Sequence, residues 1–401
     1  MHVVIVGAGP TGFVLSLVLA RAGIEVTLLD KESSIDLRPR AAHLAPAGIR
    51  VLKRAGILDD VRRAGFTPDN FTWRKRGGEP IVSYKDIGQK ENPEHWTVLP
   101  LNLLGPIMLS HAEKNSNISV KFGHRVISTG QDGTAAWAVI QANDGTEKKV
   151  VADFLVGCDG GTSQVRKSIF GPRNFPGKTW DVQLVATNIR YPFEKYGYDD
   201  MNTIVHPDDA HVAARITKDG LWRVSYNEDT KLTHEEVVKN CPVKFERMLP
   251  GNPKPGEYTL VDINPYKQHQ RCVEKMRVGR ICVAADAAHL CNPWGGLGLT
   301  GGFADIAGLA ECLEGIHSGQ ADHSILDKWD EVRRDIYQSY INPISTANFI
   351  RVAQLDLDRA LEDPFFSMVL KSNTDPEVKK KLDESVYAVC HDFTQYYKAK
   401  A

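Results

Sequence analysis

The chain has 401 residues, 42% of them hydrophobic, and its 49 Lys and Arg are balanced by 50 Asp and Glu. This length can bury a core for about two to three domains, while the balanced charge gives no general attraction to nucleic acid or to an anionic membrane. The longest apolar runs are well short of the roughly 20 residues that a membrane-spanning helix needs. The first strand is expected directly after Met1, with no room for a signal peptide, so we expect a cytoplasmic protein that binds a small molecule.

The N-terminus carries a dinucleotide-binding motif. A short apolar run, HVVIV, precedes the sequence GAGPTG and a helical pattern. In such a motif Gly7 permits the tight turn, Gly9 lets a pyrophosphate approach the backbone, and Gly12 lets the helix pack closely on the strand. The next apolar run ends at Asp30, whose carboxylate can accept hydrogen bonds from a ribose and would repel a 2′-phosphate. The motif therefore predicts FAD or NAD, without choosing between them.

A second strand, glycine-rich loop and helix follow near the three-quarter point, in RICVAADAAHLCNPWGGLGLTGG. The strand ends at Asp286, where a carboxylate can bond ribityl hydroxyls. The glycines would bring bare backbone against a flavin ring, and the helix from about Gly301 would aim its N-terminal amides at the ring's N1 side. An NAD dehydrogenase needs no second site of this kind, whereas FAD is long and binds extended. The pair of sites therefore favours FAD.

Seven cysteines are scattered along the chain with no C-x-x-C spacing. A zinc site or a redox dithiol needs closely spaced thiols, so no metal site is expected. We interpret the cysteines as buried free thiols.

Three motifs in order resemble the class A (single-component) flavoprotein aromatic hydroxylases, the group of 4-hydroxybenzoate and salicylate hydroxylases. They are GAGPTG, the sequence FLVGCDGGTSQVRK at 154–167, and AADAAHLCNPWGGLGLTGG. The resemblance covers residues 1 to about 340. It implies an α/β fold, in which a Rossmann-like FAD-binding domain of the glutathione-reductase type is interleaved with an antiparallel β-sheet substrate domain and followed by C-terminal helices. The expected boundaries are 1–70, 100–171 and 272–340 for the FAD-binding domain, 71–99 and 172–271 for the substrate domain, and 341–401 for the C-terminal helices.

The resemblance also assigns residues to the cofactor. The second motif contributes Asp159, Gly160, Ser163 and Arg166, and Arg40 stands where the family has an arginine that reaches the pyrophosphate. The full expected FAD-binding set is Gly7, Gly9, Pro10, Thr11, Gly12, Asp30, Lys31, Arg40, Asn102, Asp159, Gly160, Asp286, Pro293, Gly296, Gly298, Leu299 and Thr300.

The chain departs from the family pattern at several of these places. Ala285 precedes Asp286 where the family usually has Gly, a change that we expect to be tolerated because the Asp makes the contact. Leu297 and Thr300 replace a common Gln and Asn, and Asn102 stands where many relatives have Gln or Arg facing the flavin. These replacements affect the expected polar contacts of the ring.

In the family, NAD(P)H reduces FAD, reduced flavin adds O2 at C4a, and the hydroperoxide gives its distal oxygen to an electron-rich aromatic ring. The resemblance thus implies an NADPH- or NADH-dependent monooxygenase of a small phenolic, aromatic-acid or heteroaromatic substrate, acting as a monomer or homodimer. The protein supplies position and a dry cavity, while the flavin does the chemistry. Only one G-x-G-x-x-G is present, so NAD(P)H would bind transiently, with Arg38 and Arg40 as candidate contacts. An epoxidase, oxidase or reductase of the same fold is the alternative.

The middle of the chain predicts a β-rich insertion. Asp-Gly pairs at 132–133, 144–145 and 219–220 are typical of hairpin turns, and the segment 172–271 predicts an antiparallel sheet that covers the substrate. Side chains there that could clasp an acidic or phenolic ring by charge-assisted bonds and stacking are Arg215, Trp222, Arg223, Tyr226 and Tyr266. Arg215 and Arg223 share a face only if the register is symmetric about the turn.

Two residues of the third motif are expected beside the substrate. The resemblance places Pro293 and Trp294 over the reactive edge of the flavin, with Trp294 alternatively a structural wedge. His289 is interpreted as a structural histidine that bonds to backbone beside Asp286, rather than as a general base.

Overall fold

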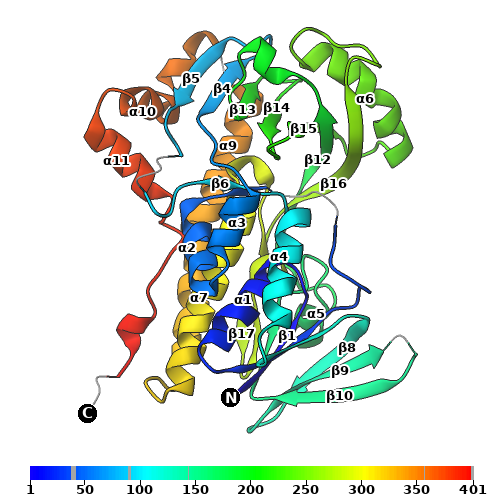
Figure 1. Ribbon diagram of the computed structural model, residues 1–401, viewed down its shortest axis with the longest axis vertical. Helices are drawn as coiled ribbons and strands as arrows, with labels where there is room; N and C mark the ends of the chain where they lie inside the picture. Colours follow the sequence, from blue (N-terminus) through cyan, green and yellow to red (C-terminus); the bar gives the residue numbers. More distant parts are fainter. Residues whose placement is uncertain (38–41, 89–91, 143, 356, 399–401) are drawn as a thin grey trace.

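The chain folds around two large sheets, placed one above the other along its longest axis (Figure 1). The computed structural model describes residues 1–37, 42–88, 92–142, 144–355 and 357–398. The lower half contains a mostly parallel sheet with its helices, and the upper half contains a mostly antiparallel sheet with helices at both ends (Figure 1). The predicted mixed α/β architecture is confirmed.

The lower sheet has the strand order β17-β18-β11-β1-β2-β7. Its core strands are short and buried throughout, as expected for parallel strands that are covered on both faces. Val6 at the end of β1 lies opposite Gly157 of β11 and Leu29 of β2, so the three strands end at the same edge. The strands of this sheet are β1 (His2–Val6), β2 (Glu25–Leu29), β7 (Ile118–Lys121), β11 (Phe154–Gly157), β17 (Arg277–Val278) and β18 (Ile281–Val283).

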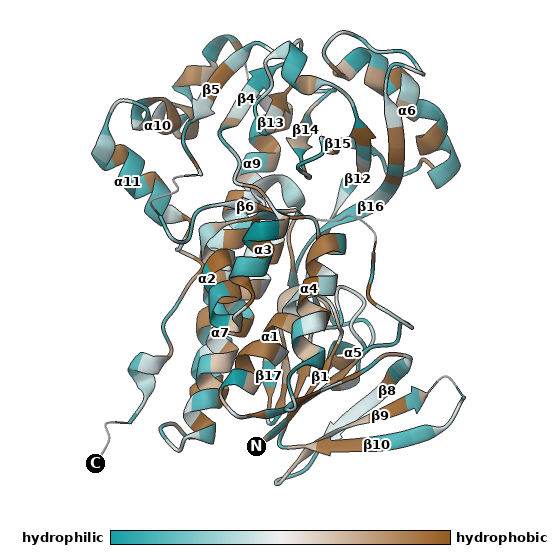
Figure 2. Cartoon of the chain, viewed as in Figure 1, coloured by the Kyte–Doolittle hydropathy of each residue, from teal (hydrophilic) through white to brown (hydrophobic). Residues whose placement is uncertain are grey.

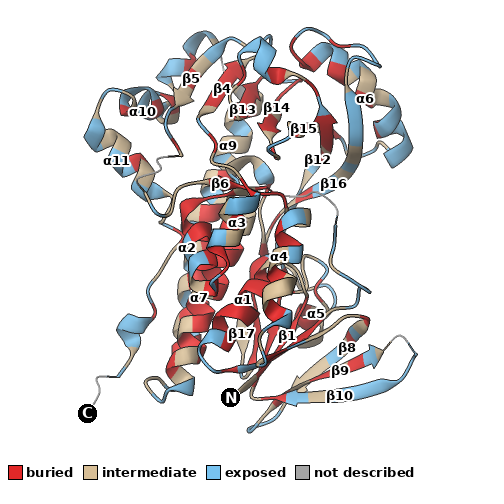
Figure 3. Cartoon of the chain, in the orientation of Figure 1, coloured by how far each residue is buried: buried red, intermediate tan, exposed pale blue. Residues whose placement is uncertain are grey.

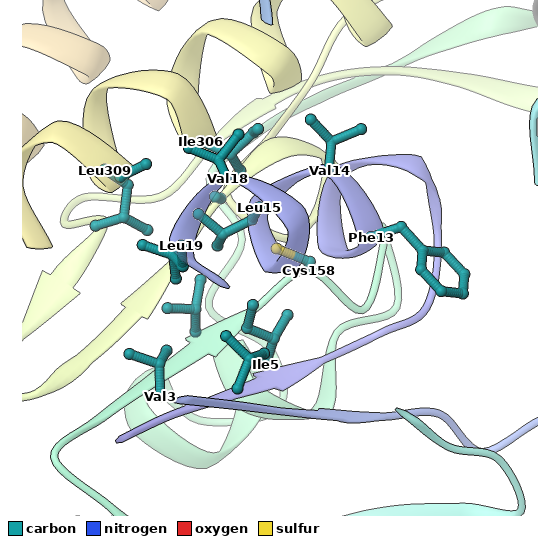
Figure 4. Packing of buried hydrophobic residues seen from close by; sticks show 14 of the residues in the cluster. Val3, Ile5, Phe13, Val14, Leu15, Val18, Leu19, Cys158, Ile306 and Leu309 are labelled. Carbon is teal, nitrogen blue, oxygen red and sulfur yellow. The ribbon is translucent and has the colours of Figure 1, made fainter. Parts of the chain in front are cut away.

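Helix α1 (Pro10–Arg21) is enclosed between this sheet and helix α7 (Leu297–His317) (Figure 4). Val3 and Ile5 of β1 lie on one side of it, and Ile306 and Leu309 of α7 lie on the other (Figure 4). Because α1 is apolar all round (Figure 2), it can only be a core helix. The remaining helices of this half are α2 (Pro46–Ala55), α3 (Leu58–Ala64), α4 (Leu101–Glu113), α5 (Gln164–Phe170) and α8 (Ile325–Ile336).

The upper sheet has the order β19-β16-β12-β15-β14-β13-β4-β5. The predicted hairpin about residues 219–220 is present as β14 and β15. The strands of the upper sheet are β4 (Phe71–Lys75), β5 (Pro80–Tyr84), β12 (Gly177–Arg190), β13 (Met201–Val205), β14 (His211–Arg215), β15 (Trp222–Asp229), β16 (Thr259–Cys272) and β19 (His289–Leu290). The buried strands at its centre contrast with the exposed outer helices (Figure 3).

Helix α6 (His234–Met248) covers one face of the upper sheet and was not predicted. A capping box starts it, in which Thr233 and Glu236 exchange hydrogen bonds. Phe245 of α6 packs on Tyr226 of β15, with ring centroids 6.3 Å apart. This face of the sheet is therefore an apolar core.

The C-terminal segment wraps the molecule. Helices α10 (Pro364–Ser372) and α11 (Pro376–Ser385) pack on the β4–β5 end of the upper sheet, where Phe366 meets Trp73. Helix α9 (Asn342–Gln354), which follows a π-helical turn at Tyr337–Ile341, contacts the short 3-10 turn Pro293–Gly295. The other short elements are β3 (His43–Leu44), β6 (Thr97–Val98), the small sheet of β8 (His124–Gln131), β9 (Ala136–Ala142) and β10 (Glu147–Ala152), and the 3-10 turns Phe193–Tyr196, Ala285–Ala287, Leu357–Glu362 and Thr394–Tyr396.

Within the described ranges, none of the helices combines the length and the apolar character that crossing a membrane requires.

Candidate active site

Four motif residues gather at one edge of the lower sheet. Gly7, Asp30, Asp159 and Asp286 each come just after a strand, β1, β2, β11 and β18 respectively, and these strands are parallel neighbours. Ligands of such sheets bind outside the carboxyl ends of the strands. Asp30 Oδ2 accepts a hydrogen bond from the Ala8 amide at 2.6 Å, so the carboxylate is held against the glycine loop.

The three glycines of the first motif meet different requirements. Gly7 has φ +106°, and a Cβ there would lie 2.4 Å from the carbonyl oxygen of Cys158. A Cβ on Gly12 would lie 1.9 Å from the carbonyl oxygen of Gly7. Both glycines are therefore required by the fold itself. A Cβ on Gly9 would meet nothing within 4 Å, so the fold does not require this glycine, and the open side is the side that a pyrophosphate would approach.

The first and third motifs are in contact. A Cβ placed on Gly302 of α7 would lie 2.7 Å from Cβ of Ala285 and 3.1 Å from Cγ2 of Thr11 in α1. Glycine at this position lets the N-terminal turns of both helices and the 285–287 turn approach one another. One extended ligand can therefore touch both motifs.

The third motif presents exposed residues within an otherwise buried segment. Asp286 is exposed between buried Ala285 and Ala287, and Pro293 and Gly296 are exposed further along. In the first turn of α4, Oδ1 of Asn102 is buried and has no hydrogen-bond partner among the described residues. A buried polar atom of this kind is completed by a ligand or by water. The residues present therefore fit the FAD that the motifs predict.

Ala285 has φ +54°, a conformation that costs a residue with a Cβ about 1–2 kcal/mol. Its amide donates to Oδ2 of Asp305 at 2.9 Å, and this bond helps to hold the turn without the family's glycine.

Asp305 is the centre of a buried polar cluster behind the 285–289 turn. Its carboxylate accepts from Nε2 of His289 at 2.7 Å and from Nε of Arg333 at 2.7 Å, and all three side chains are at most 3% exposed. Burial alone would raise the pKa of Asp305, but its interactions with His289 and Arg333 lower the pKa to about 2. The partner of His289 is thus a carboxylate and not the backbone that the sequence suggested.

Sequence reasoning missed Asp305 and Arg333. The available signal was a single carboxylate within the apolar helix segment GGFADIAGLA, which is rarely buried without a partner. The arginine that pairs with it comes from α8 and could not be identified from spacing.

The second motif joins the third. Asp159 accepts from Ser163 Oγ and from the amides of Gln164 at 2.6 Å and Val165 at 3.1 Å, so its carboxylate caps α5. Arg166 donates to the carbonyl oxygen of Ala287 at 2.9 Å. Burial raises the pKa of Asp159 in spite of these bonds. The structure thus shows Asp159 holding a helix end, and its contact with FAD stays a prediction.

The other predicted cofactor residues surround the same edge. Thr11 is buried at the start of α1. Lys31 is exposed, and its Nζ lies 3.7 Å from Oε1 of Glu32. Thr300 is buried near the start of α7. Pro10, Gly160, Gly298 and Leu299 lie in the same turns and helix starts. Arg38 and Arg40 lie outside the described residues.

The upper sheet does not bring all the predicted substrate residues together. Arg215 lies opposite Trp222, and Arg223 lies opposite Ala214, so Arg215 and Arg223 are on different faces. Arg215 pairs with Asp200 at 3.1 Å and lies over the ring of Phe66.

Tyr226 and Trp222, two of the predicted substrate residues, are packed in the core beneath α6 and do not share a face with Arg223. The cause is strand alternation, because residues one apart on β15 point to opposite faces. Tyr266 of β16 lies opposite Leu184 and is 46% exposed. Arg223 and Tyr266 both lie on the inner face, the face of the sheet away from α6. There Nε and Nη2 of Arg223 donate to Oδ1 of Asn188 at 3.1 and 2.9 Å.

Pro293 and Trp294 lie in the 3-10 turn between the lower and upper sheets. The ring of Trp294 is 6.3 Å from that of Phe349 in α9, and its Nε1 is buried without a hydrogen-bond partner among the residues that the structure describes. The turn is thus covered by α9 and closes one side of the site.

Comparison with known proteins is consistent with this geometry. Residues 1–342 match the family described as FAD binding domain. The chain is 35% identical over 382 residues to para-nitrophenol 4-monooxygenase of Pseudomonas sp. (strain WBC-3), covering 94% of this chain and 93% of the relative. It is also 35% identical over 354 residues to 6-hydroxy-3-succinoylpyridine 3-monooxygenase of Pseudomonas putida (strain DSM 28022 / S16), covering 86% and 88%.

Among solved structures, p-nitrophenol 4-monooxygenase from Pseudomonas putida DLL-E4 superposes with a TM-score of 0.90 at 33% identity, over 96% of this chain and 97% of that one. The resemblance first seen in three motifs therefore extends over nearly the whole length. The chain belongs to the class A flavoprotein aromatic hydroxylases, which are FAD-dependent monooxygenases of aromatic compounds.

Proposed function

We propose that this monooxygenase uses NADH or NADPH and O2 to hydroxylate a small aromatic ring that already carries a hydroxyl group. The observation that carries this proposal is the contact of Gly302, Ala285 and Thr11, because it joins the two motif regions into a site for one extended cofactor. The substrate class is supported by two relatives that are named for para-nitrophenol and for a hydroxylated pyridine.

The residues present suggest how FAD would be held. The N-terminal amides of α1 beside Gly9 would face the pyrophosphate, Asp30 the ribose, and Asp286 the ribityl chain. Bound FAD would supply electron acceptance from NAD(P)H and oxygen transfer to the ring. The positive end of α7, at its N-terminus beside Gly296, would face the flavin ring, where negative charge develops on reduction. The 3-10 turn at Pro293 and helix α9 above it would exclude water.

Removal of the Asp286 carboxylate should weaken the binding of FAD. We expect Asp286→Ala to weaken FAD binding about 10- to 150-fold, since hydrogen bonds to a charged group contribute about 1.5–3 kcal/mol. Titration of the apoprotein with FAD, followed by flavin fluorescence, measures this. Asp208→Ala, an exposed acid in a turn of the upper sheet, serves as the control. Full retention of FAD by Asp286→Ala would defeat the assignment.

The reaction can be tested with the purified protein. We expect a yellow protein whose NAD(P)H oxidation is stimulated by 4-nitrophenol or a related phenol, with one oxygen atom from O2 incorporated into the aromatic product. Mass spectrometry of the product and a peroxide assay distinguish the outcomes. If every phenol, aromatic acid and hydroxypyridine gives only hydrogen peroxide, the protein acts as an oxidase and the proposed hydroxylation is wrong.

A further inference from the structure

His43 lies where the two halves of the molecule meet. It is the first residue of strand β3, which pairs with β6, and His43 lies opposite Val98. Its neighbour Ala42 packs with Ile216, which extends β14 toward the hairpin turn of the upper sheet. The ring of His43 is thus placed between the FAD-binding half and the strands that carry Arg215 and Arg223.

One nitrogen of the His43 ring has no partner. The ring makes a hydrogen bond to the backbone of Arg215, and this bond acts to raise its pKa, as a bond donated to a carbonyl does. Nε2 is buried and has no hydrogen-bond partner among the described residues, which leaves Nδ1 as the donor. Nε2 therefore carries the lone pair of the neutral ring and can accept a hydrogen bond.

The ring stays neutral near neutral pH. Burial is the largest cause, and together with the nearby charge of Arg223 it lowers the pKa of His43 to about 4, against the opposing bond to Arg215. A buried acceptor that stays unpaired costs about 1–3 kcal/mol. A ligand that donates a hydrogen bond to Nε2 would remove this cost.

The surroundings distinguish His43 from another buried histidine. His211 of β14 also has an unpartnered Nε2 among the described residues and a pKa lowered, chiefly by burial, to about 4. His211, however, lies opposite Tyr226 and so on the face covered by α6. His43 instead lies near Arg223, on the inner face, where Arg223 is held by Asn188. Of the two unpaired nitrogens, that of His43 is therefore the one beside the face that carries Arg223.

We propose that Nε2 of His43 accepts a hydrogen bond from the ring hydroxyl of the substrate, and that His43 thereby positions the ring and selects substrates that carry this donor. The proposal rests on the proposed function and deepens it, because it names the residue that recognises the hydroxyl group. Sites built to bond a substrate hydroxyl reject analogues that lack it, since a buried polar group is then left unpaired.

The test compares 4-nitrophenol with 4-nitroanisole, which has a methyl group in place of the hydroxyl proton. Dissociation constants are measured with the FAD-loaded protein, below the pKa of the free phenol, from the change in flavin absorbance. We expect the wild type to bind the phenol at least about 10-fold more tightly, which corresponds to about 1.4 kcal/mol. In His43→Leu this preference should fall below about 3-fold, with anisole binding almost unchanged.

Two further variants separate recognition from folding. His43→Gln retains an acceptor oxygen and should recover part of the preference. His211→Gln changes the matched histidine on the α6 face and should leave the preference at the wild-type value. Flavin content and the thermal midpoint of each variant report whether it is folded.

The outcomes are distinct. If His43→Leu is folded, loaded with FAD and still prefers the phenol by the wild-type factor, the role of His43 is overturned while the proposed function stands. If the wild type neither binds phenols nor shows phenol-stimulated NAD(P)H oxidation, the proposed substrate class fails and the role of His43 fails with it.

Discussion

Replacing Gly9 with alanine is expected to weaken FAD binding without unfolding the protein. The backbone at Gly9 is extended, with φ −79° and ψ 179°, which alanine adopts freely, and the added Cβ would meet no protein atom within 4 Å. The methyl group would instead occupy the space that the pyrophosphate needs to reach the amides of α1. Overpacking of this kind costs about 1–3 kcal/mol, so we expect an affinity loss of about 5- to 150-fold.

The measurement has two parts, titration of the apoprotein with FAD and thermal unfolding of the apoprotein alone. Gly133→Ala is the matched control, because a Cβ at Gly133 also meets nothing within 4 Å but lies in the hairpin turn between β8 and β9. Gly12→Ala should instead destabilise the apoprotein, since its Cβ would collide with the backbone of Gly7. Tight FAD binding by Gly9→Ala would contradict the placement of the pyrophosphate.

Replacing Arg333 with methionine is expected to destabilise the protein by about 3–5 kcal/mol, the usual cost of leaving a buried carboxylate without its cation. Arg333 and Asp305 are both fully buried and lie 2.7 Å apart. Methionine fills similar volume, so loss of packing contributes little. Urea denaturation of the wild type and the variant measures the change in the free energy of unfolding.

The adjacent residue in the same helix provides the control. Arg334 pairs with Asp330 at the same distance of 2.7 Å, but its side chain is 32% exposed. Exposed pairs contribute up to about 1 kcal/mol, so Arg334→Met should have a small effect. Equal losses in the free energy of unfolding of the two variants would show that the buried ion pair of Asp305 stabilises the protein no more than an exposed pair does.

The parts of the site that follow a strand directly could be predicted from sequence. Gly7, Asp30 and Asp286 each stand at the end of an apolar run, and parallel pairing then brings such ends to one edge. These inferences need only local pattern and one topological rule. The fold class came instead from the family resemblance that the three motifs carry.

The faces on which side chains of the upper sheet lie, and the helix that covers it, could not be predicted from the local sequence pattern. The separation of Arg215 from Arg223 depends on a register of one residue across the hairpin, and a shift of one residue exchanges the two faces of a strand. Helix α6 was missed although Thr233 and Glu236 form the signature of a helix start. Pro242 lies within this helix, and proline disfavours a helix interior. The segments on either side have the pattern of β-strands.

Contacts between distant segments were beyond local reasoning altogether. The pairing of Asp305 with Arg333 joins two helices, and the position of His43 depends on where β3 meets the upper sheet. Neither residue type nor spacing predicts which distant side chains will be in contact, because the sequence does not distinguish these residues from the many other arginines and histidines of the chain.

The strand order of the lower sheet also constrains how the chain is made. Strand β11 pairs with β1 on one side and with β18 on the other, and β18 is followed along the chain by Ala285 and Asp286. During translation β11 therefore presents an open hydrogen-bonding edge until the ribosome has released the segment that contains β18. Unpaired edges of this kind are prone to aggregation, so the lower sheet is protected only after that late strand has paired.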